Sequence, residues 1–351
     1  MRFDLSEDQR LLRDSARNFF AAEFPLETSR RVMEHEPRGF DATAWKRVAE
    51  MGYVGLAVPE AASGQGLGMI ELAIVLEEVG RACVPGPYLD VVLAAELLRS
   101  GGEQENLLGE IASGEKIVVI AEDDSPFAGG VHGTGTTFAN GRVHGRKYFV
   151  PFAADAHVLL VTTPDGAYRV DGPLPGAPLP TFDPSQRFAR VDLDHPAQPI
   201  ADGAGIERLR RISATAAAAE LLGVMTRAFD LTLDYVKTRQ TFGRAIGSFQ
   251  ALQHRLAEMM LRVESSRAAV YRAAWCIDHG DPQAALAAAS AKAYAGDSAR
   301  LVCGESIQMH GGIGFTWELD LHFYLKRAKT LEVHHGSTET QLERALVAAG
   351  L

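Results

Sequence analysis

Cysteine is scarce in this sequence. Its 351 residues include only three cysteines, Cys83, Cys276 and Cys303, which lie far apart and form no C-x-x-C pair. Disulfide-rich folds and structural zinc sites depend on closely spaced cysteines. We therefore expect neither a disulfide framework nor a zinc site, and we interpret the three side chains as buried or inert thiols.

Long apolar runs are also missing. The first residues, MRFDLSED, lack the apolar core of a signal peptide. No later run approaches the length of about 20 residues that a membrane-spanning helix needs. These absences predict a cytoplasmic protein with no membrane partner.

An excess of positive charge is absent as well. Lys and Arg number 35 against 45 Asp and Glu, a net charge of -10. General nucleic-acid binders concentrate basic residues, so we expect no nucleic-acid partner. A small anionic ligand would need a local basic patch. The length, with 46% hydrophobic residues, is sufficient for two or three cores and a buried active site.

The sequence predicts an α+β fold with three domains. Ser6 is a good N-cap, and helical spacing follows it and recurs at 42–51, 70–82 and 89–100, so residues 1–114 are predicted to form a helical domain. The Gly-rich segment 59–68 is predicted to be a flexible loop.

Short β-branched runs begin at residue 117. Strands are expected at 117–121, 157–162, 168–170 and 188–193, and Asn140-Gly141 predicts a hairpin. Residues 115–201 are thus expected to form a small antiparallel β domain with a Pro-rich excursion near 172–184. Four helical patterns follow, roughly 206–237, 248–279, 282–309 and 317–348, which predict a four-helix bundle for residues 202–351.

A glycine-rich turn lies between the last two helical patterns, in Gln308-Met309-His310-Gly311-Gly312. Glycine lets backbone amides approach a ligand closely, which suits a phosphate or a flat polar ring. Simple turn formation is the alternative explanation for Gly311, Gly312 and the later Gly336.

A second group of candidates follows the first helical pattern of the bundle. Arg239 can bind a pyrophosphate with two parallel hydrogen bonds, whereas Lys237 is better explained as a cation that offsets the helix dipole. Phe242 offers an apolar face for an adenine. Gln250 and Gln308 offer amides for the polar edges of a cofactor, although either one alone is more often an ordinary surface residue.

In this order, Arg239-Gln240-Thr241-Phe242-Gly243, Phe249-Gln250 and Gln308 to Gly312 resemble the C-terminal half of the acyl-CoA dehydrogenase family. The resemblance extends over essentially the whole chain. It implies FAD bound between subunits, α,β-dehydrogenation of an acyl-CoA thioester, and electron transfer to an acceptor protein. It also implies these cofactor contacts: Arg239, Phe242, Gln250, Gln308, Gly311, Gly312, Gly336 and Ser337.

The middle domain departs from the family pattern. The family usually has a Thr-Glu pair where this sequence has Ala121-Glu122, and a Thr where it has Pro151. Ala121 has no hydroxyl, and Pro151 has neither hydroxyl nor N–H. This asymmetry resembles the paired subunits that form α2β2 tetramers in actinobacterial steroid side-chain degradation. The partner is therefore expected to be another acyl-CoA dehydrogenase-like subunit or a second copy of this chain.

The catalytic base is the main puzzle. In most of the family a glutamate precedes the final glycine, but here His335 precedes Gly336. The adjacent His334 and His335 point apart and have no carboxylate partner at ligand spacing in the sequence, so no metal is expected. The alternative family location for the base aligns with Ser213, which cannot act as a base.

Glu220 lies two turns beyond Ser213 and is the only charge in an apolar helical segment, so we expect it to be buried. Burial would raise the pKa of its carboxyl group, as a base in this reaction requires. We take Glu220 as the leading catalytic candidate, with a solvated or subunit-interface glutamate as the alternative. Glu318 and Glu339 are weaker candidates, because both lie in polar surroundings.

Three hypotheses follow for function. The chain is a catalytic subunit that uses Glu220, or a structural partner that completes the FAD site of a different catalytic chain, or a flavin monooxygenase on the same fold. The small side chains of 214–219 are expected to leave room for a bulky or steroid-type acyl group.

Overall fold

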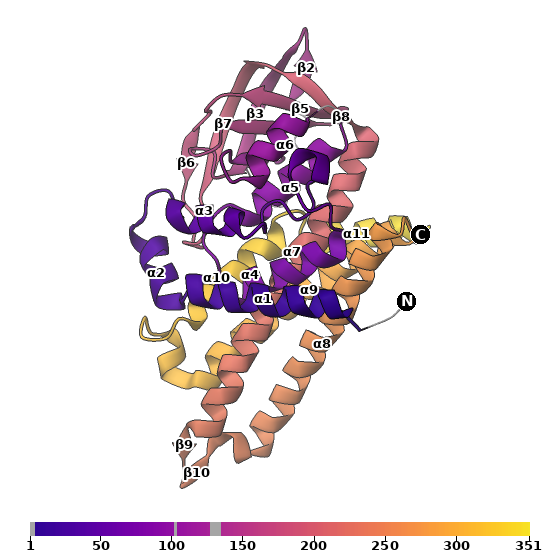
Figure 1. The fold of residues 1–351 in the computed structure, drawn as a ribbon. Helices are drawn as coiled ribbons and strands as arrows, with labels where there is room; N and C mark the ends of the chain where they lie inside the picture. Colours follow the sequence, from indigo (N-terminus) through magenta and orange to yellow (C-terminus); the bar gives the residue numbers. More distant parts are fainter. Residues whose placement is uncertain (1–3, 102–103, 127–134) are drawn as a thin grey trace. The chain divides into compact units, whose positions relative to one another are not determined.

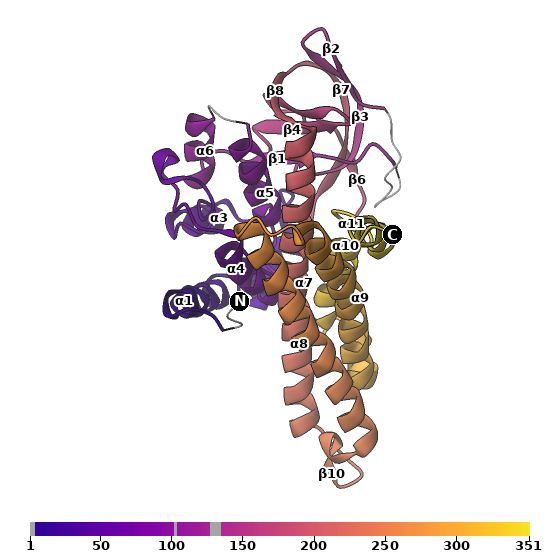
Figure 2. The ribbon, with the colours of Figure 1, turned by 90° about the vertical axis from the view of Figure 1, so that its right-hand side faces the viewer.

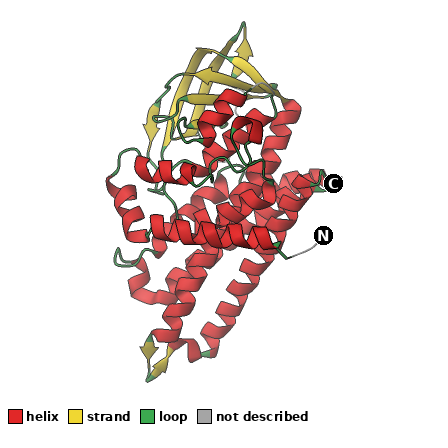
Figure 3. Ribbon diagram, viewed as in Figure 1, coloured by secondary structure: helices red, strands yellow, loops and turns green. Residues whose placement is uncertain are grey.

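The structure, a computed structural model, describes residues 4–101, 104–126 and 135–351. The first three residues of the N-terminal segment interpreted above therefore lie outside the described part. Helices come first, strands follow, and helices return, as predicted (Figure 1, Figure 3). The chain forms two compact units: a helical unit of residues 1–26, 73–84 and 215–351, and a mixed unit of residues 27–72 and 85–214. The bounds of the three predicted domains stay a prediction.

The mixed unit contains two helices that the sequence predicted, α3 (Ala42–Glu50) and α5 (Tyr88–Arg99). It also contains elements that the sequence analysis missed: α2 (Leu26–His35), α6 (Glu105–Ala112) and a 3-10 turn, η1 (Glu60–Ala62), inside the Gly-rich segment. In α5, every residue from Tyr88 to Leu98 is buried. This helix is therefore enclosed on all sides rather than amphipathic.

The strands of the mixed unit form two four-stranded sheets. Their orders are β1-β4-β5-β8 and β2-β3-β7-β6. The bounds are β1 (Val118–Ala121), β2 (Thr137–Ala139), β3 (Arg142–Pro151), β4 (Val158–Thr163), β5 (Gly166–Asp171), β6 (Ala177–Leu179), β7 (Phe188–Pro196) and β8 (Gln198–Asp202). The hairpin at Asn140-Gly141 is confirmed: both residues have positive φ, 52° and 74°, and they join β2 to β3.

One strand pairing differs from the predicted antiparallel arrangement. β1 pairs with β4 in parallel, with Val118 opposite Val158. The long connection between these strands makes this possible, because a parallel pair cannot be joined by a tight turn. β6 and β8 were also missed, since β6 lies in the Pro-rich excursion and β8 directly follows β7.

The helical unit contains α1 (Glu7–Glu23) and most of α4 (Met69–Arg81). Ser6 caps α1 as predicted: its hydroxyl accepts from the Gln9 amide, and the Gln9 side chain accepts from the Ser6 amide. α4 approaches the next long helix, α7 (Gly203–Thr238), very closely. A Cβ atom on Gly223 would lie 1.8 Å from the Glu77 carbonyl oxygen, so only glycine fits there.

The bundle is built from α7, α8 (Gln250–Asp278), α9 (Ala284–His310), α10 (Leu321–Val333) and α11 (Thr338–Ala348) (Figure 2). The alanine-rich α9 packs against α8, α10 and α11. Its small side chains let these helices approach closely.

The fourth predicted helical pattern, 317–348, is wrong as a continuous helix. It is split into α10 and α11 by a turn in which His335 and Gly336 have φ of 59° and 95°. Positive φ is incompatible with a right-handed helix. Ser337 then starts α11, because its hydroxyl accepts from the Thr340 amide.

Candidate functional site

A short hairpin follows α7. β9 (Gln240–Thr241) and β10 (Arg244–Ala245) pair in an antiparallel manner around Phe242-Gly243, whose φ values are 56° and 79°. Two successive residues of positive φ are typical of the turns that join two-residue hairpins, where Asn-Gly is usual. A phenylalanine in this position is strained, and such strain clusters at functional sites.

The ring of Phe242 projects from this hairpin and is 90% exposed. Its edge faces the ring of Phe249 at 6.3 Å between centroids, and the guanidinium of Arg244 covers Phe249 at 4.1 Å. Arg239 and Gln250 are exposed at the two ends of the same segment. The hairpin thus presents an apolar ring among cations, which suits an adenine next to phosphates.

The glycine-rich turn begins where α9 ends at His310. Gly311 has φ 63° and ψ -140°, a conformation that only glycine adopts readily. A Cβ atom added at Gly311 or Gly312 would meet no atom within 4 Å, so the backbone here is open. Gln308, one turn earlier, is exposed.

His310 joins the glycine turn to α7. Its ring stacks on Tyr235 at 4.2 Å between centroids, and the Tyr235 hydroxyl donates to the His310 carbonyl oxygen at 3.4 Å. Burial lowers the pKa of His310 below its ordinary value, an effect that the hydrogen bond to the Ser306 carbonyl oxygen opposes. Because Tyr235 lies one turn before the hairpin, this contact brings six predicted cofactor residues to one end of the bundle. We call Arg239, Phe242, Gln250, Gln308, Gly311 and Gly312 the bundle tip.

Gly336 and Ser337, the other two predicted contacts, lie elsewhere. The Gly336 carbonyl oxygen accepts from Lys292 of α9, which precedes Gln308 by sixteen residues. That separation is about 24 Å along a helix axis. Within one chain, the predicted cofactor residues therefore form two groups rather than one.

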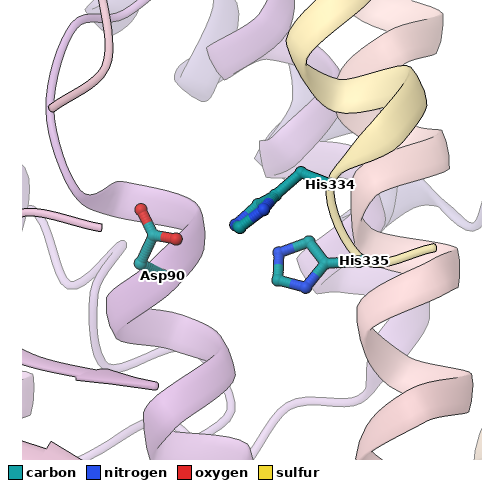
Figure 4. A group of neighbouring side chains, drawn as sticks. All are labelled: Asp90, His334 and His335. Carbon is teal, nitrogen blue, oxygen red and sulfur yellow. The ribbon is translucent and has the colours of Figure 1, made fainter. Parts of the chain in front are cut away.

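The turn that carries Gly336, residues 334–337, is called the α10–α11 turn. Figure 4 shows the two imidazoles of His334 and His335 beside each other at the end of α10, with 4.1 Å between ring centroids. The Gln341 side chain donates to the His335 carbonyl oxygen at 2.8 Å and holds the turn against α11. The expectation that the two side chains point apart is therefore wrong. That no metal binds these histidines stays a prediction.

Glu220, the predicted base, is buried in the helical unit as expected, with 1% of the residue exposed. Its carboxylate accepts a hydrogen bond from the buried guanidinium of Arg327 in α10 at 2.8 Å, and Arg327 also donates to the Val84 carbonyl oxygen at 2.6 Å. The carboxylate is therefore one member of a buried ion pair, whereas proton abstraction from a thioester calls for a carboxylate that is free to accept the proton. The catalytic role of Glu220 stays a prediction, with a structural ion pair as the alternative.

The other base candidates differ in exposure. Ser213 is buried in the mixed unit, whereas Glu318 and Glu339 are exposed. The pKa of Glu339 lies below its ordinary value, because its carboxylate accepts from its own amide and from Ser337 at the start of α11. Neither exposed glutamate has the desolvated surroundings that proton abstraction from a thioester requires.

Polar groups in and next to the middle strands bond to one another. The ammonium group of Lys147 in β3 bonds to Asp124 at 2.9 Å and to the Glu122 carbonyl oxygen at 2.8 Å. Burial lowers the pKa of Lys147, an effect that Asp124 opposes. Beyond Lys147, β3 is irregular in its pairing with β7 before Pro151 pairs with Phe188. Ala121, at the end of β1, is fully buried.

Sequence reasoning missed four residues that support these groups. Tyr235 and His310 join the bundle tip, and Arg327 and Lys292 contact Glu220 and Gly336. Lys292 could have been found by the argument used for Glu220, since it is the only charged residue in the alanine-rich segment 284–296. The other three belong to segments that meet only in the folded bundle.

The bundle tip fits FAD in its donor chemistry. A dinucleotide needs a cation for its pyrophosphate, an apolar face for its adenine and open amides for close approach. Arg239, Phe242 and the Gly311-Gly312 backbone provide these three features without being covered by the described part of the chain.

Two comparisons with known families match most of the chain. Residues 6–115 match the N-terminal domain of acyl-CoA dehydrogenases, and residues 206–350 match their C-terminal domain. The chain therefore belongs to the acyl-CoA dehydrogenase family, as the sequence motifs predicted.

Individual relatives extend over nearly the full length. The chain is 34% identical to the acyl-CoA dehydrogenase IpdE2 of Mycolicibacterium smegmatis over 95% of this chain and 94% of that protein. It is 31% identical to IpdE2 of Mycobacterium tuberculosis, over 95% of this chain and 92% of that protein. Among solved structures, a variant of the Tcur3481-Tcur3483 steroid ACAD is 29% identical with a TM-score of 0.89, over 98% of both chains. A chain of the ChsE4-ChsE5 complex of Mycobacterium tuberculosis is 27% identical with a TM-score of 0.90, over 100% of this chain and 99% of that chain.

Hydropathy agrees with the absence of long apolar runs. Within the described residues, the helices are all too short or too polar to cross a membrane.

Proposed function

We propose that this chain is a subunit of an FAD-dependent acyl-CoA dehydrogenase that converts an acyl-CoA thioester to its α,β-unsaturated product. The observation that carries the proposal is the bundle tip, where a strained and 90% exposed Phe242 adjoins exposed Arg239 and an open glycine turn. An aromatic ring held in a strained conformation in water is best explained by a ligand or subunit that covers it.

The proposed roles follow from the chemistry of each group. The Arg239 guanidinium pairs with the pyrophosphate, the Phe242 ring covers the adenine, and the amides of the glycine turn approach polar cofactor edges. When bound, FAD supplies the acceptor for the hydride that leaves the β carbon. The α proton must go to a carboxylate positioned near the thioester and shielded from water.

The proposed FAD site is shared between subunits. The bundle tip and the α10–α11 turn are separated by about 24 Å along α9. This distance supports an arrangement in which the two groups of one chain contact different FAD molecules, so that each FAD is bound by residues of two chains. We propose an acyl-CoA dehydrogenase-like partner in an α2β2 assembly, with a homo-oligomer as the alternative. The ChsE4-ChsE5 complex and the Tcur3481-Tcur3483 enzyme are each named as a pair of proteins, which supports the heteromeric version. The name steroid ACAD of the second supports a bulky or steroid-type acyl chain. Electron transfer to an acceptor protein and a cytoplasmic location complete the proposal.

The assembly is tested by expressing the chain alone and together with a second acyl-CoA dehydrogenase-like subunit. The flavin absorbance, the ratio of flavin to chain, and anaerobic bleaching by steroid-type and straight-chain acyl-CoA esters are then measured. We expect full flavin loading and bleaching only with the partner, and faster bleaching with the bulky esters. Full loading and bleaching by the chain alone would reject the heteromeric version, and a colourless complex would reject the function.

The origin of the base divides the proposal in two. In one version Glu220 removes the proton; in the other the partner subunit supplies the base and this chain completes the cofactor site. Two ion pairs support the second version, because each one already binds a charged group that a catalytic site would need: Glu220 with Arg327, and Lys147 with Asp124.

Glu220→Gln in the assembled complex distinguishes the two versions. If Glu220 is the base, bleaching is abolished while flavin stays bound. If the partner supplies the base, bleaching continues and only the unfolding midpoint falls. Glu258→Gln, at an exposed position in α8, is the matched control and is expected to change neither.

A further inference from the structure

Lys292 is a lysine that the protein encloses on all sides. It lies in the first half of α9, only 1% of it is exposed, and its neighbours along the helix are mainly alanines. A buried ammonium group is costly unless polar groups compensate for the lost water. The reaction proposed above does not use this group, so its presence needs another explanation.

Two backbone carbonyl groups accept from the Lys292 ammonium group. Its Nζ atom lies 3.1 Å from the Glu332 oxygen and 3.1 Å from the Gly336 oxygen. Glu332 is in the last turn of α10, where carbonyl groups lack helical partners and the helix dipole favours a cation. Gly336 lies beyond the end of α10. The ammonium group therefore bridges the end of α10 and the α10–α11 turn.

The backbone of this turn is unfavourable by itself. His335 has φ 59°, which is rare for a residue with a side chain, and Gly336 has φ 95°. A Cβ atom on Gly336 would lie 2.6 Å from the Gln341 amide nitrogen, so the turn is also tightly enclosed. Contacts from α9 and α11 must therefore hold the turn in this conformation.

We propose that Lys292 is a positioning residue for the cofactor contact of the α10–α11 turn: its ammonium group holds the Glu332 and Gly336 carbonyls and thereby fixes the backbone that presents Gly336 and Ser337. The part that concerns the cofactor rests on the proposed function. The part that concerns the turn does not.

The charge of Lys292 adds a pH dependence to this contact. Burial lowers its pKa to about 7, so the group titrates near neutrality. A charged ammonium group donates stronger hydrogen bonds than a neutral amine. The turn is therefore held more firmly below pH 7 than above it. Two charged groups act on Lys292: Glu332 on α10 favours the ammonium form, and Arg344 on α11 opposes it. Glu332 in turn pairs with Arg300 of α9.

The test compares Lys292→Met with Lys329→Met, which removes an exposed lysine from α10. Hydrogen exchange of residues 333–338 is followed at pH 6 without flavin, and FAD affinity is measured by fluorescence on the assembled complex. Losing hydrogen bonds from a charged donor is expected to speed exchange and weaken FAD binding by about tenfold or more. Lys329→Met is expected to change neither quantity.

The outcomes separate the two parts of the inference. Unchanged exchange in Lys292→Met overturns it entirely, and faster exchange with unchanged FAD affinity overturns its cofactor part. If the wild-type complex binds no FAD, the proposed function fails while the exchange comparison still decides on the turn. Should Lys292→Met not fold, the wild-type protein is compared between pH 6 and pH 8.5. Protection of 333–338, corrected for intrinsic exchange, must then fall with rising pH, and constant protection overturns the proposal.

Discussion

At the bundle tip the guanidinium of Arg239 and the ring of Phe242 project from the protein, whereas the ammonium group of Lys147 in β3 is completely enclosed. Lys147 bonds to Asp124, and Asp124 accepts in turn from the Thr136 hydroxyl at 2.5 Å. The bundle tip leaves its cation and its aromatic ring available to a ligand. In the middle strands, the cation is already bound to a carboxylate of the same chain.

The difference between the two regions is informative about function. In the middle strands, the two positions that depart from the family pattern are enclosed: Ala121 is fully buried, and Pro151 pairs with Phe188. The cation of β3, Lys147, is already paired with Asp124. At the tip, the positions that keep the family pattern are exposed. A chain with this distribution is suited to completing a shared cofactor site from its helical bundle.

The largest expected effect is on the enclosed ion pair of the middle strands. Lys147→Met leaves Asp124 without its cation, which is expected to lower the free energy of unfolding by about 3–5 kcal/mol. Urea denaturation measures the change. Arg146→Met, which removes the exposed partner of Asp192, is the control and should have no measurable effect. Similar losses in both variants would contradict the distinction between enclosed and exposed pairs.

A second effect concerns Asp123, next to this ion pair. Burial, followed by the charge of Glu122, raises the pKa of its carboxyl group from 3.8 to about 7. Between these values the folded state binds the proton more tightly, so stability falls as pH rises from 4 to 7, by up to about 1.4 kcal/mol per pH unit. Asp123→Asn should remove this slope in urea titrations across that range. A slope that persists in the variant would show that other groups cause it.

At the tip, Phe242→Ala is expected to weaken FAD binding about tenfold in the assembled complex, because a base loses its stacking partner. The ring is 90% exposed, so the variant should unfold at the same urea concentration as the wild type. Fluorescence titration with FAD measures the affinity. Loss of stability without loss of affinity would make Phe242 a structural residue and reverse the comparison.

The smallest expected effect is a gain in stability. Phe242→Asn places Asn-Gly in a turn with two positive φ values, which should relieve strain and stabilise the fold by about 0.5 kcal/mol. The thermal midpoint would rise slightly while FAD binding weakens. A lower midpoint would show that the ring supports the hairpin through Phe249.

Local signals in the sequence predicted much of the fold. The Ser6 cap and the Asn140-Gly141 hairpin depend on neighbouring residues, and both are confirmed. The parallel β1–β4 pair was missed because its partners are forty positions apart, Val118 and Val158. The break between α10 and α11 was missed because it depends on His335, a residue whose positive φ is imposed by its surroundings.

For the candidate site as well, local features could be predicted from the sequence, whereas contacts between distant residues could not. The apolar helix around Glu220 correctly indicated burial, but its partner Arg327 is 107 positions later and could not be inferred from spacing. The motifs identified Arg239, Phe242 and Gly311 as cofactor candidates. The Tyr235–His310 stack and the hydrogen bond from Ser306 to the Ala228 carbonyl oxygen join α7 to the end of α9, and residue spacing could not predict either contact.

The parallel pairing of β1 has a consequence for how the chain folds. The β2–β3 and β4–β5 hairpins close over short loops and can form within microseconds of their synthesis. β1 has to wait for β4, since Val118 has no strand partner in its sheet until Val158 has been made. Closing that long loop costs entropy before any contact compensates for it. Docking of this first strand is therefore expected to be a late and slow event in the assembly of the sheet.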